Sequence, residues 1–186
     1  MTSFVGGNYI LAGIIFKEQK YIDFGLKLAE SYFEPYLQTA SGIGPEVFHW
    51  VDSNNATNAP PADKKDFYEK AGFWTTVADY VLRPETMESI YYSYRVTGDK
   101  KYQDMAWTGF NHIYEKCRTG SGFSGLNDVD QADGGGFDNV QESFFLAETL
   151  KYLYLVFTDD SDVQVKAGSP NKFVFNTEAH PVKIYG

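Results

Sequence analysis

Apolar residues recur at helical spacing along most of this chain, and this periodicity constrains the fold more than any other feature of the sequence. Clusters that favour turns, Gly98-Asp99 and Thr158-Asp159-Asp160, separate consecutive segments. Strand character is confined to Lys172–Phe175. The pattern therefore predicts a mainly α fold. The segments with helical spacing are Tyr9–Phe16, Ile22–Tyr36, Phe67–Leu82, Thr86–Val96, Tyr102–Tyr114 and Glu142–Phe157.

A weak internal repeat indicates how these helices pair. The segment Lys20–Gly25 resembles Lys101–Ala106, because both begin with Lys-Tyr and carry an aspartate two residues later. Glu85-Thr86-Met87 likewise resembles Glu148-Thr149-Leu150. We expect repeated helical hairpins that place the two glutamates at equivalent positions. In a closed ring of such hairpins, equivalent positions converge on the axis, so the repeat predicts that the two carboxylates share a common centre.

Composition narrows the classes of function. With 186 residues the chain fits one domain, and no stretch approaches the ~18 to 20 consecutive apolar residues that a membrane span needs. The first residues show no basic segment followed by an apolar core, so no secretory signal is expected. The net charge of −9, without a basic run, makes nucleic acid an unexpected partner. Aromatic side chains form 17% of the chain, which favours an acidic, aromatic cleft for a neutral carbohydrate.

The cysteine and the loop composition exclude several metal sites. Cys117 is the only cysteine, so the chain can form neither an internal disulfide nor a thiolate zinc cage. The loop Cys117–Asp138 is rich in Gly and Asp, but it fails the register of an EF-hand, because Asn139 stands where the bidentate Glu is needed. We expect this loop to be solvated.

Two separate segments place carboxylates where a fold usually avoids them. In Arg83–Ser89, a proline favours the first position of a helix, so Glu85 and Glu88 would project from its first turn on one face. In Phe175–Pro181, a hydroxyl and a carboxylate follow an apolar strand, where a turn would ordinarily carry glycine. Each segment alone has a structural explanation, since acids in a first turn favour the helix dipole. Both segments together favour a site that handles sugars.

Four motifs occur in order along the chain: Gly44–Phe48, Leu82–Ser89, Glu142–Tyr152 and Phe175–Pro181. Together they resemble the class I α-1,2-mannosidases, glycoside hydrolase family 47, over essentially the whole chain, and Gly42–Glu46 is most similar to the fungal branch. The resemblance implies a partial (αα)7 toroid of stacked helical hairpins with a C-terminal β-hairpin plug, which Lys172–Pro181 would form. Residues 1–186 would be the C-terminal part of a single catalytic domain, with the N-terminal hairpins absent.

The resemblance implies a calcium-dependent enzyme that trims α-1,2-linked mannose from high-mannose N-glycans with inversion of configuration. Thr177, in the Asn-Thr-Glu motif, would hold Ca²⁺ directly through its hydroxyl and its carbonyl. Surrounding carboxylates would hold the waters of the ion, and sugar hydroxyls would complete the coordination of this hard cation. The carboxylates that match this shell are Glu85, Glu88, Glu148 and Glu178.

The resemblance also assigns catalytic and substrate-binding side chains. Inverting hydrolysis needs one carboxyl group that protonates the leaving oxygen and another that activates water. Glu85 matches the carboxylate proposed as general base, and Glu46 matches one counted among the catalytic acids of the family. Arg83 and Phe144 match residues that orient the terminal mannose and stack on it. The implied substrate-binding set is Arg83, Glu88, Phe144, Glu148 and Glu178.

The sequence departs from the family pattern in its upstream part. Family members carry a long N-terminal portion with a further catalytic glutamic acid and an aspartate, which match nothing in this sequence. Ser3 stands at a cysteine position of the family, and the position of its partner falls near Tyr32, so the family disulfide is not expected. Helices without their toroid neighbours would expose apolar stripes.

We therefore expect an incomplete site in the isolated chain, and a missing N-terminal half or a companion chain as its partner. Two alternatives stay open: a non-catalytic calcium-dependent module that binds mannose, and an inactive truncated product. The family acts in the secretory pathway, in the ER or Golgi, or is secreted. The glycosylation sequon Asn55-Ala56-Thr57 is compatible with that location.

Overall fold

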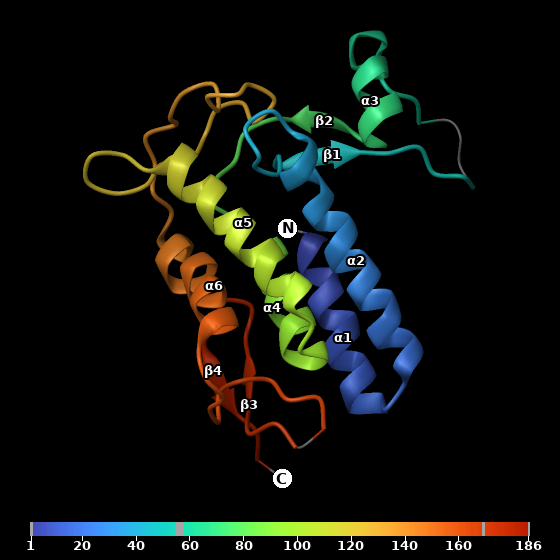
Figure 1. The fold of residues 1–186 in the computed structure, drawn as a ribbon, viewed down its shortest axis with the longest axis vertical. Coiled ribbons are helices and arrows are strands. Elements are labelled where there is room, and N and C mark those ends of the chain that lie inside the picture. The colour runs from blue at the N-terminus through green and yellow to red at the C-terminus, as the bar shows by residue number, and fades with distance from the viewer. Residues whose placement is uncertain (1, 55–57, 169, 186) are drawn as a thin grey trace.

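The computed structural model describes residues 2–54, 58–168 and 170–185, so the sequon Asn55–Thr57 lies outside the described residues. The fold is mainly α-helical, as the periodicity predicts (Figure 1). None of the helices in these ranges combines the length and the apolar character that crossing a membrane requires. The helices are α1 (Val5–Phe16), α2 (Gln19–Gln38), α3 (Lys65–Ala71), α4 (Glu85–Thr97), α5 (Lys100–Cys117) and α6 (Leu150–Phe157). The strands are β1 (Val47–His49), β2 (Trp74–Val77), β3 (Phe173–Phe175) and β4 (Pro181–Lys183).

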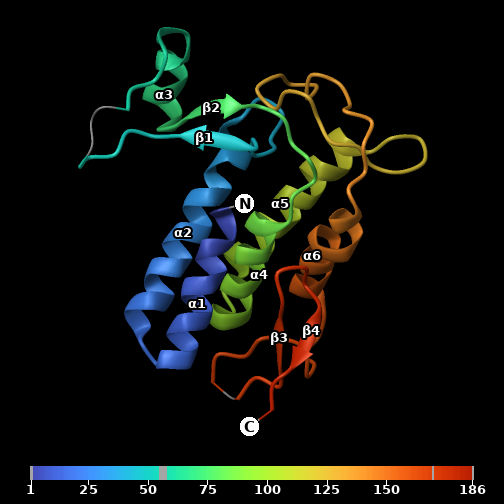
Figure 2. The same ribbon diagram turned by 180° about the vertical axis from the view of Figure 1, so that it is seen from behind.

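The long helices form two layers. In Figures 1 and 2, α1, α4 and α6 lie side by side and run in the same direction. Helix α1 packs against α2 and α4, and α4 packs against α5 and α6. The pairs α1–α2 and α4–α5 are therefore the repeated hairpins that the sequence predicts, and α6 follows as the next helix of the same layer. Buried rings of Phe33, Tyr91, Tyr102 and Tyr152 fill the core between the layers.

The internal repeat has a packing reason. Gly25 lies in α2 and Ala106 lies at the matching position in α5, and both are buried. A Cβ atom on Gly25 would lie 2.6 Å from the carbonyl oxygen of Gly6 and 2.8 Å from Cγ1 of Ile10, both of which belong to α1. A small residue is therefore needed where the two helices of this hairpin approach each other.

Two predictions of secondary structure are wrong. The segment Phe67–Leu82 is not one helix, because α3 ends at Gly72, which adopts a left-handed conformation, and the chain then enters β2. The β-branched and aromatic residues Trp74–Val77 pair with β1 in an antiparallel register. Strand structure is therefore not confined to the C-terminal hairpin, in which β3 pairs with β4.

Two further segments differ from their predictions. The predicted helix Glu142–Phe157 contains a π-helical turn, Phe145–Thr149, ahead of α6. The loop that we expected to be solvated is partly buried, because Leu126 and Val129 are fully buried and Leu126 forms a β-bridge with Tyr80. Two apolar side chains among the Gly and Asp residues thus fold the loop onto the helices.

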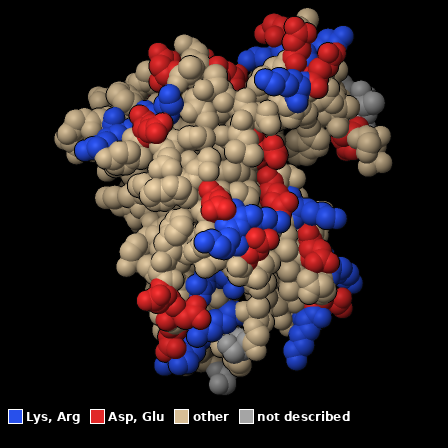
Figure 3. All heavy atoms as spheres, in the orientation of Figure 1, with Lys and Arg blue, Asp and Glu red and all other residues tan. Residues whose placement is uncertain are grey.

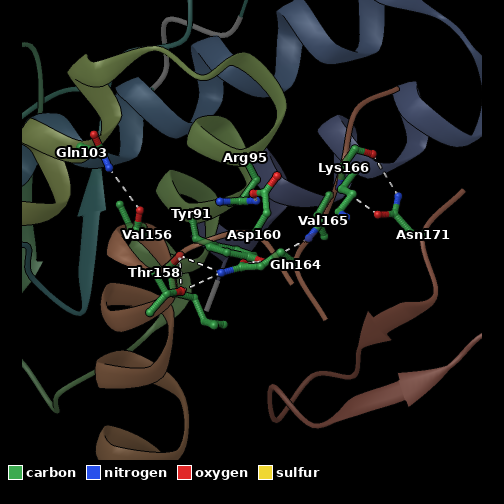
Figure 4. Close-up of polar contacts among 11 residues, drawn as sticks. Tyr91, Arg95, Gln103, Val156, Thr158, Asp160, Gln164, Val165, Lys166 and Asn171 are labelled. Atoms are coloured by element: carbon green, nitrogen blue, oxygen red, sulfur yellow. Dashed lines mark hydrogen bonds and ion pairs between the residues drawn. The ribbon is translucent and has the colours of Figure 1, made fainter. Parts of the chain in front are cut away.

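The segment between α6 and β3 is fastened to α4 (Figure 4). The hydroxyl of Tyr91 donates a hydrogen bond of 2.8 Å to Oε1 of Gln164 and accepts one of 3.2 Å from the N–H of Val165. Arg95 forms an ion pair with Asp160 beside them. These contacts hold the segment between α6 and β3 against α4. The β3–β4 hairpin that follows lies beside α4 and α6 (Figure 2).

One face of α5 and α6 exposes apolar side chains, which we call the α5–α6 face. Trp107 is 54% exposed, Tyr154 is 70% exposed and Phe157 is 49% exposed, and they border a groove of about 260 Å³. In Figure 3, few charged residues cover this part of the surface. The α5–α6 face is the kind of apolar stripe that we expect on helices of an open toroid.

Replacing Gly25 with alanine should lower the free energy of unfolding by about 1 to 3 kcal/mol, because the added methyl group must push α1 and α2 apart. Denaturant unfolding followed by circular dichroism measures the change. Gly120→Ala is the matched control, since a Cβ there meets nothing within 4 Å, and it should change stability by less than about 0.5 kcal/mol. Equal effects of the two substitutions would contradict the close packing of this hairpin.

Candidate active site

The acidic segments meet at one cavity of about 250 Å³, which we call the acidic cavity. Glu85 and Glu88 reach it from the first turn of α4, and Glu148 reaches it from the π-helical turn before α6. Thr177 reaches it from the turn between β3 and β4, and Asn8 of α1 lines another side. The structure thus brings together residues that lie far apart in the sequence.

The start of α4 is held by its own backbone and by α1. The carbonyl of Pro84 accepts a hydrogen bond of 2.8 Å from the N–H of Glu88, which places both acids of the motif in the first helical turn. The buried hydroxyl of Ser89 donates to the carbonyl of Ser3 over 2.6 Å and accepts from the N–H of Gly7 over 3.1 Å. These bonds fix the two carboxylates relative to α1.

A hydrogen bond fixes the π-helical turn against the approach to α4. The buried hydroxyl of Thr149 donates to the carbonyl of Leu82 over 2.7 Å. Leu82 has a φ of 62°, a left-handed conformation that is uncommon for a residue other than glycine. Because Leu82 directly precedes Arg83, the bond links the turn that carries Glu148 to the backbone before Glu85. Both glutamates line the acidic cavity, as the repeat predicts.

The turn between β3 and β4 is organised by one asparagine. Oδ1 of Asn176 accepts hydrogen bonds from the N–H groups of Glu178, at 3.0 Å, and His180, at 2.8 Å. Ala179 is buried and has a φ of 57°. Thr177 and Glu178 are both exposed, and Thr177 lines the acidic cavity. Glu178 is not among the residues that line the acidic cavity, although its charge acts on Glu148.

The acidic cavity concentrates negative charge. Burial raises the pKa of Glu88 to about 7 despite a hydrogen bond from Tyr152, and the charges of Glu85 and Glu148 add to the rise. Burial also raises the pKa of Glu148, followed by the charges of Glu85 and Glu178. Oε2 of Glu85 is buried without a hydrogen-bond partner in the described part of the chain. Buried carboxylates of this kind call for a cation.

The chemistry of the donors fits a hard cation. The carboxylates and the hydroxyl of Thr177 offer oxygen atoms, which Ca²⁺ prefers. Within residues 2–54, 58–168 and 170–185, no three His, Cys, Asp or Glu side chains are arranged to ligate one ion together. The oxygen donors that line the acidic cavity are nevertheless of the kind that a hard cation takes.

Glu46 and Arg83 form a second group next to the acidic cavity. Nε of Arg83 lies 2.6 Å from Oε1 and 2.8 Å from Oε2 of Glu46, and its guanidinium lies 5.9 Å from the ring centroid of Phe144. Glu46 and Arg83 line a smaller cavity of about 60 Å³. Glu85 lines both cavities, so it is the side chain that joins the two groups.

Several residues at the site were not singled out from the sequence. Tyr92 and Asn8 line the acidic cavity, and Tyr152 lowers the pKa of Glu88. The sequence could have indicated Asn8, because it is the one amide side chain in the otherwise apolar helix α1. Nothing in the sequence distinguishes the two tyrosines, since buried tyrosines are common in helical cores.

Paired helices in two layers, with carboxylates gathered where the helices of one layer begin, are the architecture of a helical toroid. The chain belongs to glycosyl hydrolase family 47, whose sequence profile matches residues 1–184. The alpha-1,2-mannosidase from Trichoderma reesei, an (αα)7 barrel, superposes with a TM-score of 0.97 and 60% identity. The match covers 100% of this chain and 38% of that chain. The fold is therefore part of an (αα)7 toroid.

Fungal relatives agree with this assignment. The chain is 48% identical over 184 residues to the mannosyl-oligosaccharide alpha-1,2-mannosidase 1B of Aspergillus oryzae, covering 99% of this chain and 35% of that protein. It is 46% identical to the mannosyl-oligosaccharide alpha-1,2-mannosidase 1B of Emericella nidulans, covering 100% of this chain and 36% of that protein. The chain thus spans about a third of the length of the curated relatives that it matches.

Without a bound cation, Glu88→Gln should stabilise the chain at pH 8 by up to about 3 kcal/mol and have little effect at pH 4.5. The folded pKa of Glu88 is raised, so the folded state binds the proton more tightly than the unfolded state. Stability is therefore lost as pH rises from the ordinary carboxyl pKa to about 7. Denaturant unfolding at both pH values in chelator-treated buffer measures the effect. Glu69→Gln, on exposed α3, is the control, and a gain from Glu88→Gln that is equal at both pH values would contradict the assignment.

Proposed function

We propose that this chain is the C-terminal part of the catalytic domain of an α-1,2-mannosidase. The whole protein would remove α-1,2-linked mannose from high-mannose N-glycans with inversion of configuration. The single observation that carries the proposal is the acidic cavity, where Glu85, Glu88, Glu148 and Thr177 meet beside the Glu46–Arg83 pair. The relatives are named as mannosidases that act on α-1,2 linkages of mannosyl-oligosaccharides, and family membership supports the transfer of this activity to the whole protein. The N-glycan substrate and the inversion of configuration follow from the family resemblance of the sequence.

We infer that the acidic cavity takes Ca²⁺. Thr177 would hold the ion through its hydroxyl and carbonyl oxygens, and the carboxylates would accept hydrogen bonds from the waters of the ion. The unpartnered oxygen of Glu85 and the raised pKa of Glu88 support this inference, because both groups gain from a nearby positive charge. When bound, the ion would supply a fixed positive centre that orients sugar hydroxyls.

The protein side chains would divide the remaining tasks. Glu85, which lines both cavities, would act as the general base that takes a proton from the attacking water. Glu46, which pairs with Arg83, would be one of the catalytic acidic groups. Arg83 is held by Glu46 and lies near the ring of Phe144, so it can donate hydrogen bonds to a sugar that stacks on that ring. Glu88, Glu148 and Glu178 would bind water and sugar hydroxyls.

We further propose that the remaining hairpins of the toroid come from polypeptide outside this sequence, either upstream in the same protein or in a companion chain. The apolar α5–α6 face and the coverage of about a third of each relative support this proposal. N-glycans are processed in the secretory pathway and outside the cell, so we place the protein there. The alternative function is a calcium-dependent glycan-binding module, in which the same carboxylates and the ion hold mannose without cleaving it.

Thr177→Val should weaken Ca²⁺ binding to the 186-residue chain at least about tenfold, because the hydroxyl ligand is lost while the backbone carbonyl stays. Isothermal titration calorimetry with Ca²⁺ measures the affinity. Thr76→Val is the matched control, since Thr76 is an exposed residue of β2 away from the acidic cavity, and it should leave the affinity unchanged. An unchanged affinity in Thr177→Val would remove Thr177 from the proposed site.

The enzyme and the binding module are separated by a chimera in which the upstream part of the Trichoderma reesei mannosidase precedes this chain. The chimera should release mannose from α-1,2-mannobiose only with Ca²⁺, and Glu85→Gln should lower kcat about 10²- to 10⁴-fold. Glu115→Gln, on the exposed surface of α5, should keep full activity. A folded chimera that binds mannose in the presence of Ca²⁺ without turnover would favour the binding module instead.

A further inference from the structure

Lys151 connects α6 to the turn that carries Thr177. Its Nζ donates a hydrogen bond of 2.8 Å to the carbonyl oxygen of Ala179. Ala179 is fully buried and adopts a left-handed conformation, with a φ of 57°. Its N–H donates to the carbonyl of Asn176 over 3.0 Å, which closes the turn. Lys151 therefore binds the turn at Ala179, the residue where the backbone of the turn reverses direction.

The same face of the helical segment supplies both a carboxylate and this anchor. Lys151 follows Glu148 by three positions, so the two side chains leave the helix in similar directions. Glu148 lines the acidic cavity, and the charge of Lys151 lowers the pKa of Glu148. A shift of the turn relative to this face would change the separation between Thr177 and Glu148.

Few other contacts hold the turn against the helices. The hydrogen bonds of Asn176 to Glu178 and His180 lie within the turn and do not tie it to another element. The β3–β4 hairpin is largely exposed, and its packed ring is Phe175, which contacts Tyr91 and Tyr152 from the strand. Among the described residues, Lys151 is thus the side chain that joins this turn to a helix by a hydrogen bond.

We propose that Lys151 is a positioning residue, which sets the place of the Thr177 oxygens relative to Glu148 and thereby the affinity of the acidic cavity for a cation. The proposal rests on the proposed function for the identity of the ion. Two effects of this lysine oppose each other. Its positive charge repels a bound cation, whereas its hydrogen bond to Ala179 holds the turn in place.

Lys151→Met separates the two effects, because it removes the charge and the donor but keeps an unbranched side chain. If the hydrogen bond dominates, as we propose, the variant should bind Ca²⁺ at least about tenfold more weakly in titration calorimetry. If the charge dominates, the variant should bind Ca²⁺ more tightly, which would overturn the proposal. Lys151→Arg keeps charge and donor and should restore the affinity to within about threefold.

Lys172→Met is the matched control, because Lys172 precedes the same hairpin but pairs with Asp162 on the surface. It should leave the affinity for Ca²⁺ unchanged. Circular dichroism checks that each variant is folded. A loss of affinity in Lys172→Met equal to that in Lys151→Met would overturn the specific role of Lys151.

A second measurement needs no bound ion. In chelator-treated buffer, the amide protons of Glu178 and His180 should exchange at least about threefold faster in Lys151→Met than in the unmodified chain, as NMR measures. Unchanged exchange rates would contradict the proposal that Lys151 stabilises the turn. If the unmodified chain binds no Ca²⁺ at all, the proposed function fails, while this exchange measurement still decides the role of Lys151.

A third measurement uses only the unmodified chain, so it holds even where a variant does not fold. Saturation with Ca²⁺ should shift the ¹⁵N signal of the Lys151 ammonium group, because the ion and the ammonium act on the same turn. An unmoved Lys151 signal in a chain that binds Ca²⁺ would overturn the proposal.

Discussion

Repulsion among three carboxylates in one cavity is the constraint on which the rest of this structure depends. Glu85, Glu88 and Glu148 would separate if their backbones were free, because like charges out of water repel strongly. Hydrogen bonds at the bases of the helices oppose that separation. Ser89 joins α4 to α1, and Thr149 joins the π-helical turn to the backbone before α4. The fold thus holds these charges in a place where a cation is needed.

Local sequence patterns predicted which side chains come together, while the roles of those side chains stay predictions. The spacing of Glu85 and Glu88 placed both in one helical turn, and the weak repeat predicted that Glu85 and Glu148 share a centre, which the acidic cavity bears out. The motif after β3 marked Thr177 in the same way. These predictions were possible because periodicity and turn chemistry depend on neighbouring residues in the sequence. Equivalent positions of repeated hairpins then lie close together in the folded chain.

Other features depend on tertiary contacts that local patterns do not encode. The segment Phe67–Leu82 has apolar residues at helical spacing, yet Trp74–Val77 within it forms strand β2, because Val47–His49, distant in sequence, provides a strand with which it pairs. The loop before Asp138 has a solvated composition, yet Leu126 and Val129 bury themselves against Tyr80 and its neighbours. The hydrogen bond from Lys151 to Ala179 likewise cannot be predicted from local patterns, because it joins residues of two separate motifs.

The π-helical turn at Phe145–Thr149 has a consequence for how such a site can arise. A π turn accommodates one residue more than the α turn that it replaces, and one residue corresponds to a rotation of about 100° around a helix axis. Removing a single amino acid from this turn would therefore swing Glu148 away from its partners without altering any side chain. The direction of this acid therefore depends on the length of the segment as much as on the identity of its residues.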